Sequence, residues 1–181
     1  FFFKKKYKDL NLVEKVIRAM SLLEMLKLSG CPFCFKGGSA LMLILGESAH
    51  RLSIDIDIIC PPGTDIEPYL KDIEKFGFIS MTLDERQQRD TNIPKNHSKF
   101  FYHIAYKNDD KPAYILLDVL YEDLQYHATE EVEIKGPFIE LDGDPLKVTV
   151  PSADDILGDK LTAFAPNTSG IPYIKGGRDR S

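Results

Sequence analysis

The chain has 181 residues, of which 43% are hydrophobic and 28% charged, and its net charge is −5 at pH 7. This composition is typical of a globular protein with one sizeable core, and the acidic balance argues against broad, charge-driven binding of nucleic acid. No apolar run approaches the roughly 20 residues that span a membrane, so we expect no membrane partner. The three cysteines are too few for a disulfide framework and favour a reducing, cytoplasmic location.

The first predicted element is an amphipathic helix over residues 11–29, in which apolar residues recur at helical spacing. Asn11 is the expected N-cap, and Gly30 suits the C-terminal exit. A short strand over 31–35 follows. Cys31 and Cys34 have CxxC spacing, but the motif leads into a strand rather than opening a helix, which disfavours a redox or zinc role.

The densest polar chemistry lies in the next segment, 36–57, with the sequence KGGSALMLILGESAHRLSIDID. The glycine pair turns the chain into a short helix over 39–45, and a strand over 52–60 follows. Side chains alternate along a strand, so Asp55 and Asp57 share one face and the flanking isoleucines point to a core. Two carboxylates on one face repel each other, and hard oxygen ligands of this kind suit Mg²⁺. The adjacent glycines offer backbone N–H groups to phosphate at a helix N-terminus.

The remaining elements alternate less regularly. A capping pattern at Thr64 and Glu67 predicts a helix that ends at Gly77, and Ser152 predicts the cap of a late helix. Between them lie predicted strands and one polar loop. The strands are expected at 78–83, 99–106, 113–120, 132–134, 138–141 and 147–150, and the loop at 84–97. An α/β-like beginning followed by a meander predicts the α+β class, with a mixed sheet flanked by helices.

Several single residues have both a chemical and a structural interpretation. Asp118 lies in an otherwise apolar strand, where a carboxylate is costly unless it is paired or bound to a cation. It is either a third acid beside the Asp pair or a strand-end residue bonded locally. Lys36 and Lys160 could neutralise phosphate charge or simply be solvated. Ser53 shares the face of the Asp pair and could bond a phosphate. None of the four histidines forms a spaced pair with an acid or nucleophile, so none is assigned a catalytic role.

Two segments together resemble a known family. The first contains FKGGSAL at 35–41, RLS at 51–53 and DID at 55–57, and the second is DKLTAFAPNT at 159–168. This combination resembles the AbiEii family of nucleotidyltransferase toxins, within the polymerase-beta-like nucleotidyltransferase superfamily. The resemblance implies the nucleotidyltransferase fold, with a core over 1–150 and the start of a C-terminal helical region, apparently truncated, over 151–181.

The resemblance also implies roles for individual residues. Asp55 and Asp57 would hold Mg²⁺ and the phosphates of an NTP substrate. Phosphate would contact Lys160 and the family's glycine-glycine-serine turn, here Gly37, Gly38 and Ser39. Asp118 best matches the superfamily's third strand carboxylate, and the nearest match to the family's last acidic motif is Asp179.

The implied activity is Mg²⁺-dependent transfer of a nucleotide to an RNA, such as tRNA, or to a protein, by the toxin of a type IV toxin–antitoxin system with a cognate antitoxin. One alternative is a non-catalytic module that binds a nucleotide or an antitoxin partner. A second is a kinase using the same site. The arginine-containing loop over 84–97 is the expected place for acceptor contacts. No base-reading motif is visible in the sequence.

Overall fold

A five-stranded mixed sheet forms the centre of the computed structural model, which describes residues 9–84, 95–106, 111–137 and 139–162, together with 174–175 and 178–179. The strand order is β1 (Cys34–Lys36), β2 (Ile56–Cys60), β5 (Ala113–Tyr121), β4 (Lys95–Tyr102) and β3 (Ser80–Asp84). Only β2 and β5 run parallel, and the other neighbours are antiparallel. The predicted α+β class with a mixed sheet is therefore confirmed.

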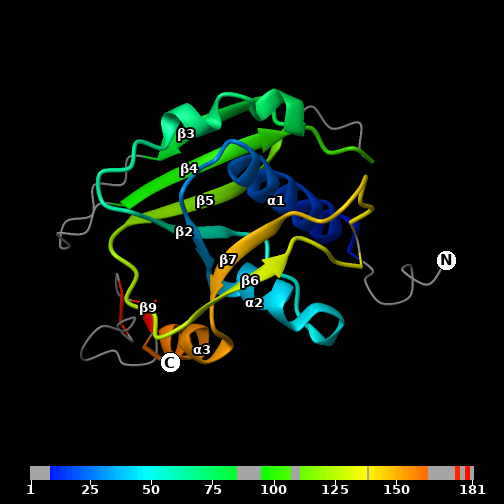
Figure 1. Ribbon diagram of the computed structural model, residues 1–181. Helices are drawn as coiled ribbons and strands as arrows, with labels where there is room; N and C mark the ends of the chain where they lie inside the picture. Colours follow the sequence, from blue (N-terminus) through cyan, green and yellow to red (C-terminus); the bar gives the residue numbers. More distant parts are fainter. Residues whose placement is uncertain are drawn as a thin grey trace.

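Helix α1 (Leu10–Leu28) lies across one face of this sheet (Figure 1). Its inner face includes Leu22, Leu23 and Leu26, all without measurable exposure, and these pack with Ile56 and Ile58 of β2. Burial of such side chains contributes about 1.5–3 kcal/mol each. The helical spacing of apolar residues in α1 and their alternation in β2 thus place this core on one side of the sheet. Asp57 of β2 points to the other side.

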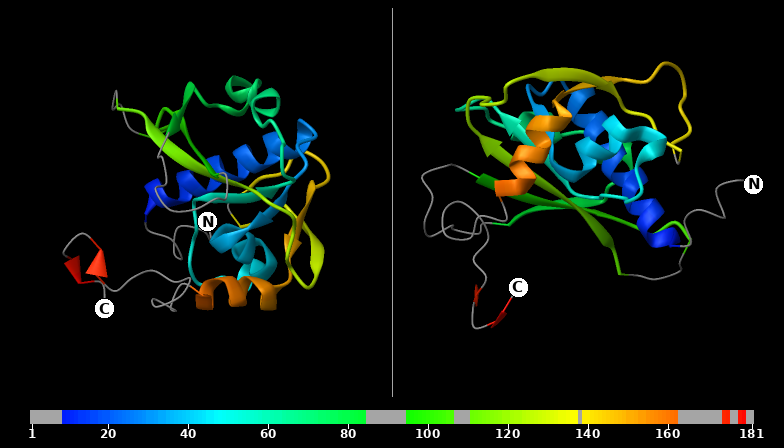
Figure 2. Two further views of the ribbon diagram at one scale, coloured as in Figure 1. Left: turned by 90° about the vertical axis from the view of Figure 1, so that its left-hand side faces the viewer. Right: turned by 90° about the horizontal axis from the view of Figure 1, so that it is seen from below.

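Two further helices lie side by side at one end of the sheet, α2 (Gly37–Leu45) and α3 (Ala153–Thr162) (Figure 2). A separate ribbon of β6 (Thr129–Glu133) and β7 (Lys147–Pro151) runs along β1 and leads directly into α3. The short elements are the 3₁₀ helices η2 (Gly46–Ser48), η3 (Glu67–Leu70) and η4 (Ile73–Phe76), and the two-residue strands β8 (Ile174–Lys175) and β9 (Arg178–Asp179).

Two predictions about helices were wrong for local reasons. Helix α1 is capped by Asp9, whose carboxylate accepts from the N–H groups of Asn11 and Leu12, so Asn11 lies inside the helix. The predicted helix after Thr64 is two 3₁₀ turns, because the Thr64 hydroxyl donates to the Pro61 carbonyl instead of capping. Pro68 also removes a backbone donor there.

Other predicted elements were displaced. The strand expected over 52–60 begins only at Ile56, so Asp55 immediately precedes it. The stretch predicted as a loop, 84–97, includes the last residue of β3, Asp84, and the first three residues of β4, 95–97. Its residues 85–94 lie outside the described residues. Residues 139–141 form no strand. All three cysteines are buried free thiols. Among the described helices, none is both long and apolar enough to cross a membrane.

Candidate active site

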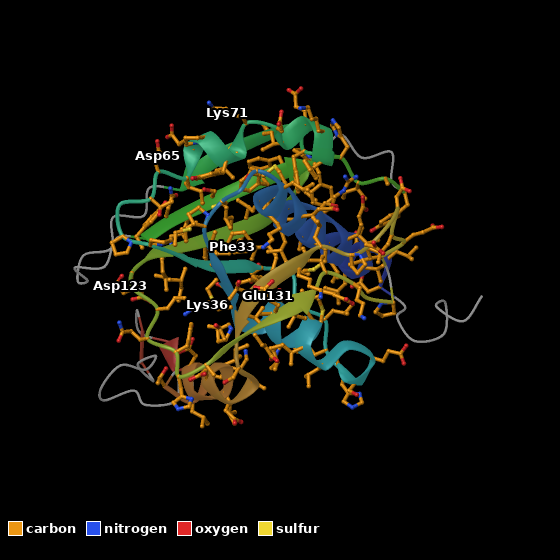
Figure 3. The ribbon with its side chains drawn as sticks, in the orientation of Figure 1. Phe33, Lys36, Asp65, Lys71, Asp123 and Glu131 are labelled. Atoms are coloured by element: carbon orange, nitrogen blue, oxygen red, sulfur yellow. The ribbon has the colours of Figure 1, made fainter. Side chains whose placement is uncertain are left out.

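A row of polar residues crosses the sheet on the face opposite α1. Lys36 on β1 pairs with Asp57 on β2, Asp57 with Asp118 on β5, and Asp118 with His97 on β4. Directly paired residues of neighbouring strands point to the same face, and neighbouring strands lie about 4.8 Å apart. Lys36 lies at the end of β1 (Figure 3). The structure thus brings together three of the residues singled out in the sequence, Lys36, Asp57 and Asp118, from three separate strands.

The carboxylates of Asp57 and Asp118 in this row, and of the neighbouring Asp55, repel one another. Burial, together with the nearby Asp118 and Asp55 carboxylates, raises the pKa of Asp57 to about 6, although Lys36 and Lys160 partly oppose the rise. The pKa of Asp55 is raised as well, first by burial and then by Asp118. Both shifts show that ionising the group is costly where it stands. A cation bound here would offset both the loss of solvation and the repulsion among the carboxylates, and so would favour their ionised form.

This crowding has a consequence for stability. Between the ordinary carboxyl pKa of 3.8 and the folded-state value of about 6, Asp57 holds a proton in the folded chain and releases it in the unfolded one. We therefore expect the free energy of unfolding in EDTA to fall by something on the order of 2 kcal/mol from this group as pH rises from about 4 to about 6. Urea denaturation of wild type and Asp57→Asn across this range measures the effect. Parallel pH curves for the two proteins would contradict it.

The glycine pair is packed directly against the acidic residues. A Cβ atom on Gly37, whose φ is +78°, would stand 2.3 Å from Asp57 Oδ2. A Cβ atom on Gly38 would stand 2.7 Å from Ser53 Oγ and 3.9 Å from Lys160 Nζ. Only glycine allows the backbone to approach these side chains so closely. Gly37, Gly38, Ser53, Asp57 and Lys160, which are distant in sequence, therefore meet at one point.

This meeting point is also the N-terminus of a helix. Helix α2 begins at Gly37, and the preceding Lys36 makes no side-chain cap to it. The first N–H groups of a helix have no intrahelical partner and, with the helix dipole, favour a bound anion. The sequence predicted this helix from residue 39, so the glycines form its first turn rather than a separate turn before it.

Gly37 provides a controlled test of this close packing. We expect Gly37→Ala to lower the free energy of unfolding more than Gly63→Ala, because both glycines have φ near +79° but only Gly37 would place its Cβ against a side chain. The shared penalty for positive φ is about 1–2 kcal/mol, and the additional loss at Gly37 reports the contact with Asp57. Chemical denaturation of the two variants checks this. Equal losses would show that Asp57 does not pack on the glycine backbone.

Ser39 has a structural contact rather than an open hydroxyl. Its side chain is fully buried, and its Oγ donates to the Asp55 carbonyl oxygen at 2.6 Å. This bond ties the first turn of α2 to the segment that enters β2 and so sets the position of Asp55 relative to the glycines. Any contact of Ser39 with phosphate would therefore come from its backbone N–H.

Helix α3 delivers Lys160 to the site and is held by two acidic anchors. Asp155 accepts from the N–H groups of His127 and Ala128 and from the Ser152 hydroxyl, which together lower the pKa of Asp155. The Asp155 N–H donates in turn to Ser152 Oγ at 3.2 Å, which confirms Ser152 as the predicted cap of this helix.

The second anchor is Asp159, which joins α3 to the polar row. Its Oδ2 accepts from Lys36 Nζ at 3.2 Å and from the Tyr126 hydroxyl at 2.8 Å. Lys36 is therefore paired in this state, and Tyr126 and Asp159 are two site neighbours that sequence reasoning did not assign. Asp159 directly precedes Lys160, but only the folded arrangement shows that its side chain reaches β1.

His97 is a further residue that the sequence analysis passed over. Its Nδ1 lies 2.5 Å from Asp118 Oδ1, and both side chains are partly exposed. No signal in the local sequence identifies this pair, because 97 was expected at the end of a loop and its partner is 21 residues away. Recognising it requires the register of β4 on β5.

Two predicted features cannot be placed. The side chain of Asp179, the candidate for the last acidic motif, and the loop residues 85–94, proposed for acceptor contacts, lie outside what the structure describes.

The site residues could bind a hard divalent cation only if substrate phosphates supply some of the ligands. Within the described part of the chain, no group of three or more His, Cys, Asp or Glu side chains is arranged as a metal cage. Mg²⁺ is commonly bound by one or two carboxylates plus substrate phosphates rather than by an all-protein cage. Asp55 and Asp57, beside the phosphate-accepting end of α2, match that mode of binding.

Comparison with known proteins identifies the family of the chain. The family model described as "Nucleotidyl transferase AbiEii toxin, Type IV TA system" matches residues 21–181, which is most of the chain. None of the curated proteins compared with the chain matches it.

Two solved structures are similar to the chain. The match with the crystal structure of JHP933 from Helicobacter pylori covers 93% of this chain and 58% of the JHP933 chain, at 17% identity and a TM-score of 0.52. A second H. pylori structure, of a candidate nucleotidyltransferase, covers 83% of the chain and 56% of its own length, at 19% identity and a TM-score of 0.46. The chain thus spans little more than half the length of the structures it matches. JHP933 shares its fold.

Proposed function

The chain belongs to the AbiEii family of nucleotidyl transferase toxins of type IV toxin–antitoxin systems, and from this premise we propose that it is a Mg²⁺-dependent nucleotidyltransferase. In this proposal the polar row and the N-terminus of α2 form a single site that binds an NTP and transfers its nucleotide to an RNA or protein acceptor. The second substrate and the partners follow the family: an acceptor such as tRNA, and a cognate antitoxin that restrains the toxin.

One observation carries the proposal: Gly37 lies against Asp57, and Gly38 lies against Ser53 and near Lys160. A phosphate group at the first turn of α2 would therefore have backbone N–H donors, a lysine and the acidic residues within one small volume. Phosphoryl transfer requires mainly positioning and charge stabilisation, and this volume supplies both.

The residues divide into three roles. The backbone N–H groups of Gly37, Gly38 and Ser39 would orient the triphosphate, and Ser53 would add a hydroxyl donor. Lys36 and Lys160 would add positive charge, with Lys36 exchanging its Asp159 partner for phosphate. Fixed cations of this kind stabilise the charge that develops on transferring phosphoryl oxygens.

Transfer itself needs a group that accepts a proton. Asp118, paired in register with Asp57, would take the proton of the acceptor hydroxyl as its oxygen bonds to the α-phosphorus and pyrophosphate leaves. His97 contacts Asp118 Oδ1, so Asp118 Oδ2 would be the oxygen that takes this proton. Mg²⁺ held by Asp55 and Asp57 would neutralise charge on the triphosphate oxygens.

A labelling screen tests this function. The four α-labelled NTPs, each with Mg²⁺, are incubated with the purified chain and either total RNA or total protein. We expect label to be transferred to one acceptor class and the transfer to disappear in EDTA. Absence of covalent label with every nucleotide and both acceptor pools, under conditions where calorimetry shows Mg²⁺–NTP binding, would instead support a non-catalytic binding module.

A further inference from the structure

A cavity lies on the same face of the sheet as the polar row, two residues further along β1 and β2. Cys34 precedes Lys36 by two residues on β1, and Ile59 follows Asp57 by two residues on β2. Cys34 and Ile59 are paired in register. Residues two apart on a strand share a face and lie roughly 6.6 Å apart. Cys34 and Ile59 therefore form the floor of a space that lies one strand repeat from Lys36 and Asp57.

Chain segments on either side of this floor form the walls of an open pocket. Its volume is about 410 Å³, and its lining includes Phe33, Leu124, Glu122 and Asp123. This size falls within the range of roughly 300–1,000 Å³ that is usual for small-molecule sites. Figure 3 shows Phe33, Lys36 and Asp123 in one region beside β1.

The segment that forms one wall of the cavity, residues 122–126, is anchored at both ends. The Glu122 N–H donates to the Cys60 carbonyl at 3.1 Å. At the other end, Tyr126 donates to Asp159, which also accepts from Lys36 of the polar row. Hydrogen bonds through Tyr126 and Asp159 thus connect this segment to Lys36 of the polar row.

The lining combines apolar walls with carboxylates. Phe33 and Leu124 present apolar surface to the cavity, and Leu124 is 47% exposed. Glu122 and Asp123 can accept hydrogen bonds but cannot donate them when ionised. A flat ring that carries N–H donors at its edge matches both properties, because apolar walls pack on its faces and carboxylates accept from amino groups at its edge.

From this lining we propose that the cavity binds the nucleobase of the NTP, and that it favours a base with an exocyclic amino group, as in ATP, CTP or GTP, over the uracil of UTP. The inference rests on the proposed function, because it assumes the triphosphate at the N-terminus of α2. It adds the position of the base and a source of selectivity.

Calorimetry with Mg²⁺ complexes of the four NTPs and of inorganic triphosphate tests the proposal. Leu124→Ala removes an apolar wall of the cavity, and Leu141→Ala is its matched control, because Leu141 is 42% exposed and lines a different cavity. We expect Leu124→Ala to weaken binding of ATP, CTP or GTP about tenfold, within the range for loss of one base-packing contact. Binding of inorganic triphosphate should be unchanged, and Leu141→Ala should match wild type throughout.

A second variant tests the selectivity. Asp123→Asn keeps the shape of the exposed side chain but replaces one acceptor oxygen with a donor. We expect it to reduce the preference for amino-bearing NTPs over UTP by about threefold to tenfold. Two results overturn the inference while leaving the proposed function intact: equal NTP affinities for Leu124→Ala and Leu141→Ala, or no discrimination against UTP in wild type, when inorganic triphosphate binds normally. Failure of wild type to bind either inorganic triphosphate or any NTP would overturn both.

Discussion

Replacing Asp57 with asparagine is expected to abolish nucleotidyl transfer, with a loss of at least about 10³-fold in kcat/KM. Removing one charge-stabilising donor in other enzymes costs about 10²–10³-fold, and in the proposed site the Asp57 carboxylate would both bind the cation and add its charge to the acidic cluster. The variant should remain folded, because the substitution removes a carboxylate whose pKa is raised to about 6 by burial and by repulsion from Asp118 and Asp55. Transfer of α-labelled NTP, measured beside circular dichroism and thermal unfolding, separates activity from fold.

Asp142→Asn is a suitable control for this experiment. Asp142 is exposed, lies in the connection between β6 and β7, and changes the net charge by the same amount. It should retain wild-type activity. If Asp57→Asn kept more than about a tenth of wild-type activity, the assignment of the acidic pair as the cation site would be wrong, whatever the behaviour of the control.

Lys160→Met is expected to have the second largest effect, a loss of about 10²-fold to 10³-fold in kcat/KM. Lys160 Nζ lies 3.9 Å from the position of a Cβ on Gly38, and its charge lowers the pKa of Asp57. Removing the ammonium group therefore takes positive charge away from both the proposed phosphate site at the N-terminus of α2 and the polar row. Most of the loss should fall on kcat if the charge acts chiefly on the developing negative charge of transfer.

Two companion variants make this result interpretable. Lys160→Arg restores a positive charge without the same geometry and should recover part of the activity. Lys75→Met removes a lysine whose side chain is 73% exposed and which pairs only with Asp72 among the contacts described, and it should be silent. An Lys160→Met variant as active as Lys75→Met would place Lys160 outside the catalytic site.

The alternation of side chains along β2 was readable in the sequence because it is local. A period of 2 around Asp57 places Ile56 and Ile58 in the core, and both are fully buried in the structure. The same locality made the glycine pair and the cap at Ser152 visible, since each depends on neighbours within a few residues.

The membership of Asp118 and His97 in the row was not readable, because it depends on strand pairing. Asp118 was left between two interpretations, and His97 was given no role, since neither residue reveals its partner without the order β2-β5-β4. A shift of one residue in the pairing would have moved these side chains to the opposite face. Contacts across 123 residues, such as that between Lys36 and Asp159, are likewise products of the tertiary fold.

The most direct test of the account is the fate of the phosphates of the nucleotide. Matched reactions contain the same NTP labelled either at the α-phosphate or at the γ-phosphate, with Mg²⁺ and the acceptor pool that accepts label. Nucleotidyl transfer predicts that the α-label becomes covalently attached to the acceptor while the γ-label leaves as pyrophosphate. Attachment of the γ-label without the α-label would identify a kinase and contradict the central claim.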